Sequence, residues 1–250
     1  MHISKNLGID CSAGRARPHH ASKATRHKRC RSILPRVNRL KRLQKAGART
    51  TGRIFNTGFK PQATFGCEVH GLSNGELHKL QKAAVACYPL FGMGKSKTLM
   101  LLAHGDPLAK QAVAAMHRWS VEVWKAANQK DSRAFSLPQH RANWEASTGH
   151  KSKDSWRTAR GPMAIARLEA SRIGWRFQGP FKLVTSTGAT VSLIEVSPKM
   201  IQTMAVQSHH VKLEQKAAIN FGDQHGFRQN RAAADEQNCA FQKDATMAVW

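Results

Sequence analysis

Positive charge is concentrated at the beginning of this 250-residue chain, and this limits how its first quarter can pack. Residues 1–60 hold sixteen Lys or Arg and one acid, Asp10, so they carry a net charge of +15 out of +25 for the whole chain. Like charges at this density repel one another in a compact state and favour polyanionic partners. Nucleic acid is the commonest such partner, and an anionic membrane is a less common one. The sequence has no run of about eighteen apolar residues that could span a bilayer.

The basic region is expected to contain two helical stretches, separated by Pro35. In the second, RVNRLKRLQKAGART from residue 36, Val37, Leu40 and Leu43 form a narrow apolar stripe along which the helix can pack. Ordinary surface helices mix charges of both signs, but acids are almost absent here. We therefore expect contact with phosphates from Arg29, Arg36, Arg39, Lys41, Arg42, Lys45 and Arg49. Residues 11–53 contain no aromatic residue, which favours the backbone of a duplex or hybrid over stacked single-stranded bases.

The stretch FGMGKSKT, residues 91–98, resembles the end of a nucleotide-binding loop. Such a loop needs a glycine five residues before its Gly-Lys-Ser, after a buried strand. Here that position is Pro89, which has no N–H to donate, and the preceding residues favour a helix. We interpret the stretch as a basic turn between helices, in which Lys95 and Lys97 can contact a phosphate.

Local signals predict a series of helices after residue 60. Ser73 and Glu76 form an S-x-x-E capping box that begins a helix over about 74–88. Its apolar face is expected to contain Leu77, Leu80, Ala84 and Cys87. A second helix is expected near 96–103, and a third from Asp106 as the N-cap to about Ala127. The buried face of the third is expected to contain Val113, Met116, Trp119 and Val123.

The second half of the chain is expected to be smaller and partly β. A helix is expected over residues 162–174. Short strands joined by a turn at 186–189 are expected in the following RFQGPFKLVTSTGATVSLIEV. Another helix is expected from the N-cap Ser197 to about Ala218. The predicted fold is α+β and mainly helical. Its predicted parts are a basic helical module (1–127), a polar linker (128–155), a helix–hairpin–helix module (156–220) and a disordered or truncated tail (221–250).

The sequence offers little for catalysis or metal binding. Its five cysteines are widely spaced without a C-x-x-C, which disfavours a disulfide framework or a paired-thiol zinc site and favours reduced intracellular thiols. The nearest cluster of metal-ligand types lacks finger spacing and consists of Cys11, His19, His20, His27 and Cys30. No Asp-Asp pair, H-E-x-x-H or G-x-G-x-x-G occurs. We expect no cofactor, no metal and no visible catalytic residue.

Several segments together resemble a known family. KNLGIDCSAG (5–14) resembles the strand that follows the catalytic palm in non-LTR retrotransposon reverse transcriptases. The segments RVNRLKRLQKAGART, QATFGCEVHGLSNGELHKLQKAA, LFGMGKSKT and HGDPLAKQAVAAMHRW are similar to the thumb and connection region of protist reverse-transcriptase-like polyproteins. RGPMAIARLEASRIGW and GATVSLIEVSP resemble the stretch that leads to their ribonuclease-H-like domain.

The resemblance covers roughly residues 3–215 and implies the part of a polymerase that grips template and primer. The palm with its metal-binding aspartates would lie before Met1, so no catalytic residue is carried over. The implied partners are RNA or an RNA–DNA hybrid, held by the phosphate backbone, and a separate or upstream palm domain; no membrane partner is expected. The expected location is intracellular, nuclear or cytoplasmic. Alternatives are a basic RNA-associated assembly protein, a decayed reading frame and an enzyme active on its own.

Overall fold

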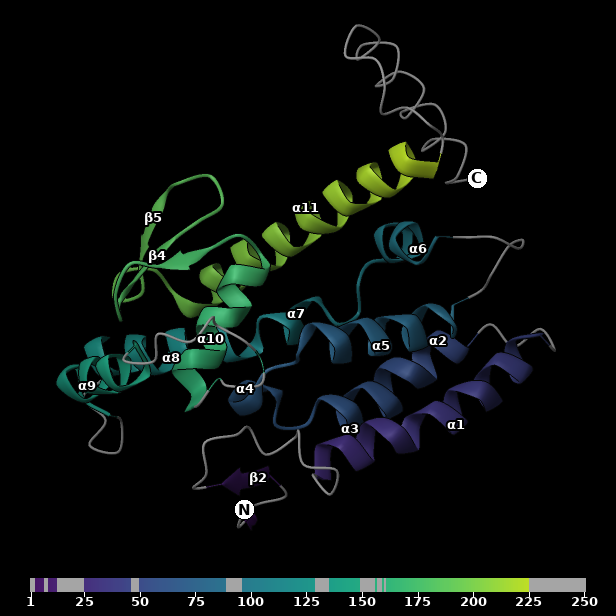
Figure 1. Ribbon diagram of the computed structural model, residues 1–250, viewed down its shortest axis with the longest axis horizontal. Helices are drawn as coiled ribbons and strands as arrows, with labels where there is room; N and C mark the ends of the chain where they lie inside the picture. The colour runs from purple at the N-terminus through teal and green to yellow at the C-terminus, as the bar shows by residue number, and fades with distance from the viewer. Residues whose placement is uncertain are drawn as a thin grey trace, which may run out of the picture.

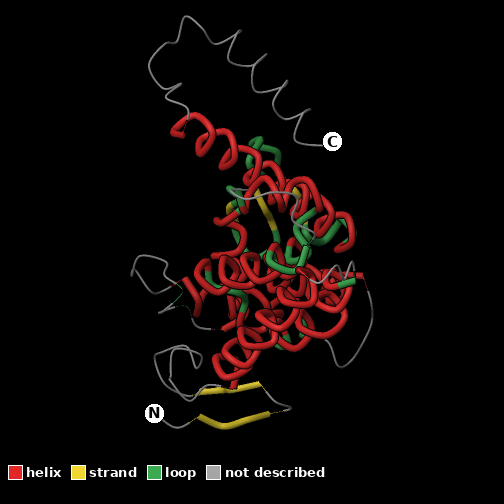
Figure 2. The backbone as a smooth tube through the Cα atoms, turned by 90° about the vertical axis from the view of Figure 1, so that its right-hand side faces the viewer, coloured by secondary structure: helices red, strands yellow, loops and turns green. Residues whose placement is uncertain are grey.

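The computed structural model describes residues 3–6, 9–12, 25–45, 50–88, 96–128, 135–148, 156, 159 and 161–224, some of them by their backbone alone. Helices dominate, and the strands form two small antiparallel sheets (Figures 1 and 2). The helices are α1 (Thr25–Lys45), α2 (Thr51–Ile54), the π-helical η2 (Phe55–Phe59), α3 (Lys60–Thr64), α4 (Cys67–His70), α5 (Asn74–Val85), α6 (Lys97–His104), α7 (Ala109–Ala112), α8 (Ala114–Asn128), α9 (Leu137–Thr148), α10 (Gly161–Arg172) and α11 (Pro198–Gln224). The strands are β1 (Ile3–Asn6), β2 (Ile9–Ser12), β3 (Arg176–Phe177), β4 (Lys182–Val184) and β5 (Thr190–Ser192). The mainly helical α+β class is therefore confirmed.

Helix α1 continues through Pro35, so the prediction of two separate stretches is wrong. A proline inside a helix removes one backbone hydrogen bond and crowds the preceding turn. Burial on both sides of it offsets this cost, because Ile33, Val37 and Leu40 recur at helical spacing and are almost fully buried. The buried stripe also differs from the predicted one at its two ends. It includes Ile33, which was not predicted, and it excludes Leu43, which is 51% exposed.

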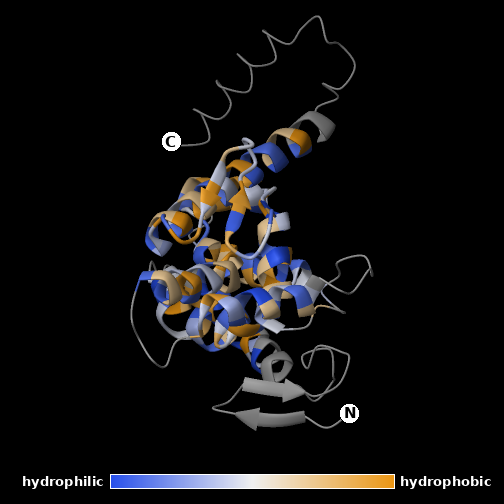
Figure 3. Cartoon of the chain, turned by 90° about the vertical axis from the view of Figure 1, so that its left-hand side faces the viewer, coloured by the Kyte–Doolittle hydropathy of each residue, from blue (hydrophilic) through white to orange (hydrophobic). Residues whose placement is uncertain are grey.

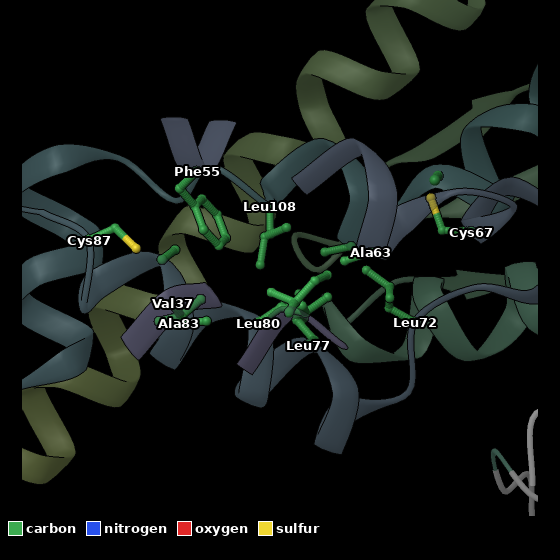
Figure 4. Packing of buried hydrophobic residues seen from close by; sticks show 14 of the residues in the cluster. Val37, Phe55, Ala63, Cys67, Leu72, Leu77, Leu80, Ala83, Cys87 and Leu108 are labelled. Carbon is green, nitrogen blue, oxygen red and sulfur yellow. The ribbon is translucent and has the colours of Figure 1, made fainter. Parts of the chain in front are cut away.

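The first hydrophobic cluster, which we call the N-terminal cluster, lies among α1, the run from α2 to α5, and α7. Its members are Ile33, Val37, Leu40, Phe55, Ala63, Cys67, Leu72, Leu77, Leu80, Ala83, Ala84, Cys87, Leu108, Ala112 and Ala114. Figure 4 shows Phe55, Leu80 and Leu108 close together at its centre. The capping box of α5 is confirmed, since Ser73 Oγ accepts from the Glu76 N–H while Glu76 Oε2 accepts from the Ser73 N–H.

The second cluster, the C-terminal cluster, joins α8, α10, α11 and the sheet β3–β4–β5. Its members are Val113, Met116, Trp119, Val123, Met163, Ala166, Ala170, Ile173, Trp175, Leu183, Val191, Leu193, Ile201 and Ala205. The turn predicted between two strands is confirmed: the Thr185 N–H donates to Ala189 O, and Gly188 adopts φ +88°. Figure 3 shows hydrophilic and hydrophobic residues interspersed on the helices, as expected where helices have one buried and one exposed face.

The helix predicted to begin at Asp106 is interrupted at Val113, which divides it into α7 and α8. The cause lies far away in the sequence. The fully buried Glu169 of α10 places Oε2 2.8 Å from the Ala115 nitrogen and 3.0 Å from the Met116 nitrogen. These N–H groups would otherwise bond within one continuous helix, and a carboxylate satisfies them as an N-terminal cap does.

Arg172, one turn after Glu169, ties the two clusters together. Its guanidinium donates to Ala112 O at 2.9 Å, to Leu72 O, and to Asn74 Oδ1 at 2.9 Å, so it meets three points of the N-terminal half. Burial lowers the pKa of Arg172 to about 10, with the neighbouring Glu169 opposing this shift. The side chain therefore stays charged at neutral pH.

Part of the predicted linker 128–155 is helical, so the prediction of a purely broken linker is wrong for residues 137–148. Helix α9 packs on α8 and α10, and the centroid of its His140 ring lies 5.0 Å from that of Trp119 in α8. A local signal for its start exists in the sequence, because Gln139 Oε1 accepts from the Ser136 N–H in an S-x-x-Q arrangement.

Helix α11 connects the two clusters along most of its length. It contacts α6, α7 and α8, and it extends six residues past the predicted end at Ala218 (Figure 1). The rest of the predicted tail, 225–250, lies outside the described residues. No helix in the described part of the chain has the length and hydropathy needed to cross a membrane.

Candidate nucleic-acid interface

The solvent side of α1 is rich in basic residues. Arg36, Arg39, Lys41 and Arg42 are exposed, while the opposite side of the helix is buried in the N-terminal cluster. The helix has no acidic residue among its 21 positions. Within the part of the chain that the structure describes, no carboxylate pairs with any of these four side chains. We call Arg36, Arg39, Lys41 and Arg42 the α1 basic face.

One edge of this face is formed with the α3 region. Arg36 Nη1 donates to Gln62 Oε1 at 2.9 Å, and the Arg29 guanidinium lies 4.8 Å from the centroid of the Phe65 ring. Arg29 and Arg36 are seven residues apart, which places them on the same stripe of a helix. Their partners run in the opposite direction, so α1 and α3 are antiparallel at this edge.

Three other predicted phosphate contacts have no described side chain. Lys45 is described by its backbone only, and Arg49 and Lys95 lie outside the described residues. The side chains of the possible metal ligands Cys11, His19, His20, His27 and Cys30 are not described either.

Lys97 is not brought to α1. It lies at the start of α6, which packs on α5 and α11, and its Nζ is 2.8 Å from His78 Nδ1 and 3.5 Å from Gln81 Oε1. Burial, followed by repulsion from Lys216, lowers the pKa of Lys97. The Lys97 charge in turn lowers the pKa of His78, with a smaller contribution from burial. Lys97 thus belongs to a separate polar site between helices.

Gln81 connects this site to the buried Asp106, which the sequence predicts only as a helix cap. Asp106 Oδ1 accepts from the Leu108 N–H at 2.9 Å, while Oδ2 lies 2.6 Å from Gln81 Nε2 and 2.9 Å from His209 Nε2. Burial alone would raise the pKa of this carboxyl, but the hydrogen bonds from His209, Leu108 and Gln81 hold it below its usual value. The carboxylate therefore joins α5 and α11 to the turn before α7.

Asp–His pairs also occur in hydrolytic triads, in which a nucleophile bonds the histidine. Both members are buried here, and among the described residues no hydroxyl or thiol bonds His209. The geometry supports a structural role.

The residues Gly71–Gly75 read G-L-S-N-G and have the spacing of a nucleophile elbow, which requires a strand before the serine and a helix after it. Here α4 precedes Ser73, whose hydroxyl lies 2.7 Å from Glu76 Oε2 in the capping box. The serine is therefore a helix cap.

Neither protein-family models nor curated proteins nor solved structures gave a match to this chain. The candidate interface is thus defined by its own geometry: a buried stripe that fixes α1, an acid-free basic face, and an edge shared with α3. Sequence reasoning found the cations of this face from their density. Phe65 lies outside the aromatic-free stretch 11–53 and reaches the edge of this face only through the packing of α3 on α1.

Proposed function

We propose that the chain binds RNA or an RNA–DNA hybrid through the phosphate backbone, with α1 as the contact helix. The observation that carries the proposal is the α1 basic face: four exposed cations on a helix without acids, held in place by a buried stripe. Cations arranged in this way bind phosphates and release condensed counterions, without reading the sequence.

The proposed biological context is a non-catalytic piece of a retroelement reverse-transcriptase polyprotein, inside the cell in the nucleus or cytoplasm. The support for this context is the resemblance of residues 3–215 to the thumb and connection region. In this proposal the chain grips template and primer, and a separate or upstream palm domain supplies the catalytic aspartates.

A second candidate is a basic RNA-associated assembly protein without retroelement activity. The feature that favours it is that α11, Arg172 and Asp106 join the two hydrophobic clusters within the described part of the chain. Co-purification with ribonucleoprotein particles would support this candidate, whereas stimulation of a palm domain's primer extension would support the first.

Salt dependence of binding tests the shared part of both candidates. A variant with Arg36, Arg39, Lys41 and Arg42 all changed to Gln removes four charges from α1. A matched control removes four exposed charges elsewhere by the changes Lys110→Gln, Arg176→Gln, Lys182→Gln and Lys199→Gln.

Fluorescence polarisation with an end-labelled RNA–DNA hybrid would give log K against log salt concentration. Each phosphate contact contributes roughly −0.9 to the slope of log K against log salt concentration. We therefore expect the loss of four contacts in the α1 variant to make this slope less negative by about 3 to 4, and the control to change it much less. A flat salt response in the unmodified protein, or equal losses in both variants, would contradict the proposal.

A further inference from the structure

An aromatic side chain stands at the edge of the α1 basic face. Phe65 is 50% exposed, and the Arg29 guanidinium lies 4.8 Å from its ring centroid. Three residues earlier, in α3, Gln62 Oε1 accepts a hydrogen bond from Arg36. The ring is therefore placed beside the cations of α1 by two contacts between the same pair of elements.

The backbone explains why the ring stays exposed. Phe65 ends α3 in an extended conformation, with φ −55° and ψ 127°, and Gly66 follows in the left-handed region at φ +77°. The chain turns here toward α4, so Phe65 occupies a corner between two helices, whereas its neighbour Ala63 is buried.

We propose that Phe65, together with Arg29, is a stacking site for an unpaired base, so that the α1 basic face takes single-stranded RNA or the single-stranded segment beside a hybrid. This inference rests on the proposed function. Aromatic rings and guanidinium planes both stack on bases, because every base has a π face, and a neighbouring cation strengthens the contact. The bases of a duplex are already stacked and paired, so they cannot occupy this site.

The cations are placed to hold the same strand. Arg36 follows Arg29 at a distance of about 10 Å along the helix, from a rise of roughly 1.5 Å per residue. Arg39 and Arg42 continue on the solvent side of α1. A strand whose base lies on Phe65 can thus place its following phosphates against the α1 basic face. The structure in this way changes the expectation drawn from residues 11–53, because antiparallel packing of α3 supplies the aromatic that α1 lacks.

The test compares three probes: a labelled oligouridylate, an abasic strand of the same length, and a base-paired RNA–DNA hybrid. We expect Phe65→Ala to weaken oligouridylate binding by about fivefold to a hundredfold, the range for loss of one stacked base. Binding of the abasic strand and the hybrid should change little. Phe65→Trp should restore oligouridylate binding, and Phe135→Ala, which removes a ring that is 58% exposed in the segment before α9, should leave it unchanged.

The outcomes separate the two proposals. If Phe65→Ala leaves oligouridylate binding intact, or weakens all three probes equally, the stacking site is overturned. The proposed function then still stands, provided that the four-charge α1 variant loses binding. If the α1 variant binds every probe as the unmodified protein does, both proposals fail together. Circular dichroism of Phe65→Ala should match that of the unmodified protein, because the ring contributes little to either hydrophobic cluster.

Discussion

Glu169 is fully buried, and its carboxylate accepts hydrogen bonds from two backbone N–H groups. Replacing it with alanine removes this acceptor. The N–H groups of Ala115 and Met116 would then begin α8 without an acceptor from α10. The Arg172 charge would also lose the carboxylate that most favours it electrostatically, although its bonds to Leu72, Asn74 and Ala112 would remain.

The expected loss follows from these contacts. A hydrogen bond to a charged group contributes about 1.5–3 kcal/mol, so two of them give roughly 3–6 kcal/mol. Losing the carboxylate that counteracts the burial of the Arg172 charge would add to this cost. We therefore expect Glu169→Ala to lower the free energy of unfolding by about 3–5 kcal/mol, a large part of a typical total of about 5–15 kcal/mol. Glu169→Gln keeps an acceptor oxygen but not the charge, and should lose about half as much.

Urea unfolding followed by far-ultraviolet circular dichroism measures the difference, provided that the slope with denaturant is the same in all variants. The exposed Glu214 of α11 supplies the matched control, and Glu214→Ala should stay within about 0.5 kcal/mol of the unmodified protein. A loss below about 1 kcal/mol for Glu169→Ala would refute the reasoning, since the carboxylate would then be no better than water for those donors.

Two further predictions concern the N-terminal half. The pKa of Asp106 lies below its unfolded value, so the stability it contributes is present above about pH 4 and is lost as pH falls through the lower native value. Unfolding midpoints across this range should therefore fall more steeply in the unmodified protein than in Asp106→Asn, and parallel curves would exclude this linkage. Gly71 has φ +56°, and an added Cβ would lie 2.3 Å from Ile165 Cγ2. Gly71→Ala should destabilise by about 1–3 kcal/mol in thermal unfolding, whereas Gly75→Ala, with open space around it in α5, should be neutral or stabilising; similar effects at both sites would count against a strained turn.

Local chemistry was sufficient to predict many helix starts from the sequence. The capping box of Ser73 and Glu76 acts within four residues, as does the N-cap at Ser197, whose Oγ lies 3.4 Å from the Met200 nitrogen. The three-stranded sheet was partly predicted in the same way, because its β4–β5 turn is short and contains Gly188 at positive φ. Such features need no information from distant segments.

The failures arose where a distant group competes with a local rule. Proline normally ends a helix, but burial of Ile33 and Val37 carries α1 past Pro35. The pattern from Asp106 to Ala127 reads as one helix, but at the break Glu169 and Arg172, more than fifty residues later, bond the backbone of Ala115 and Ala112. No pattern within 106–127 contains that information.

The candidate site follows the same division. Charge density along the sequence identified the cations of α1, since charge is a property of composition. The placing of Phe65 against Arg29, and of Lys97 against His78, depends on how helices pack and could not be predicted from spacing.

The bond between Asp106 and His209 joins residues 103 positions apart, and this has a consequence for synthesis. While the chain is being translated, the N-terminal cluster can begin to assemble once α7 has emerged, but Asp106 then lacks its histidine partner. Domains generally form from the N-terminus as they leave the ribosome. Here Asp106 stays without this partner until α11 has emerged, and a chain that ends before α11 would expose the surfaces of α6, α7 and α8 that α11 contacts to chaperones and proteases.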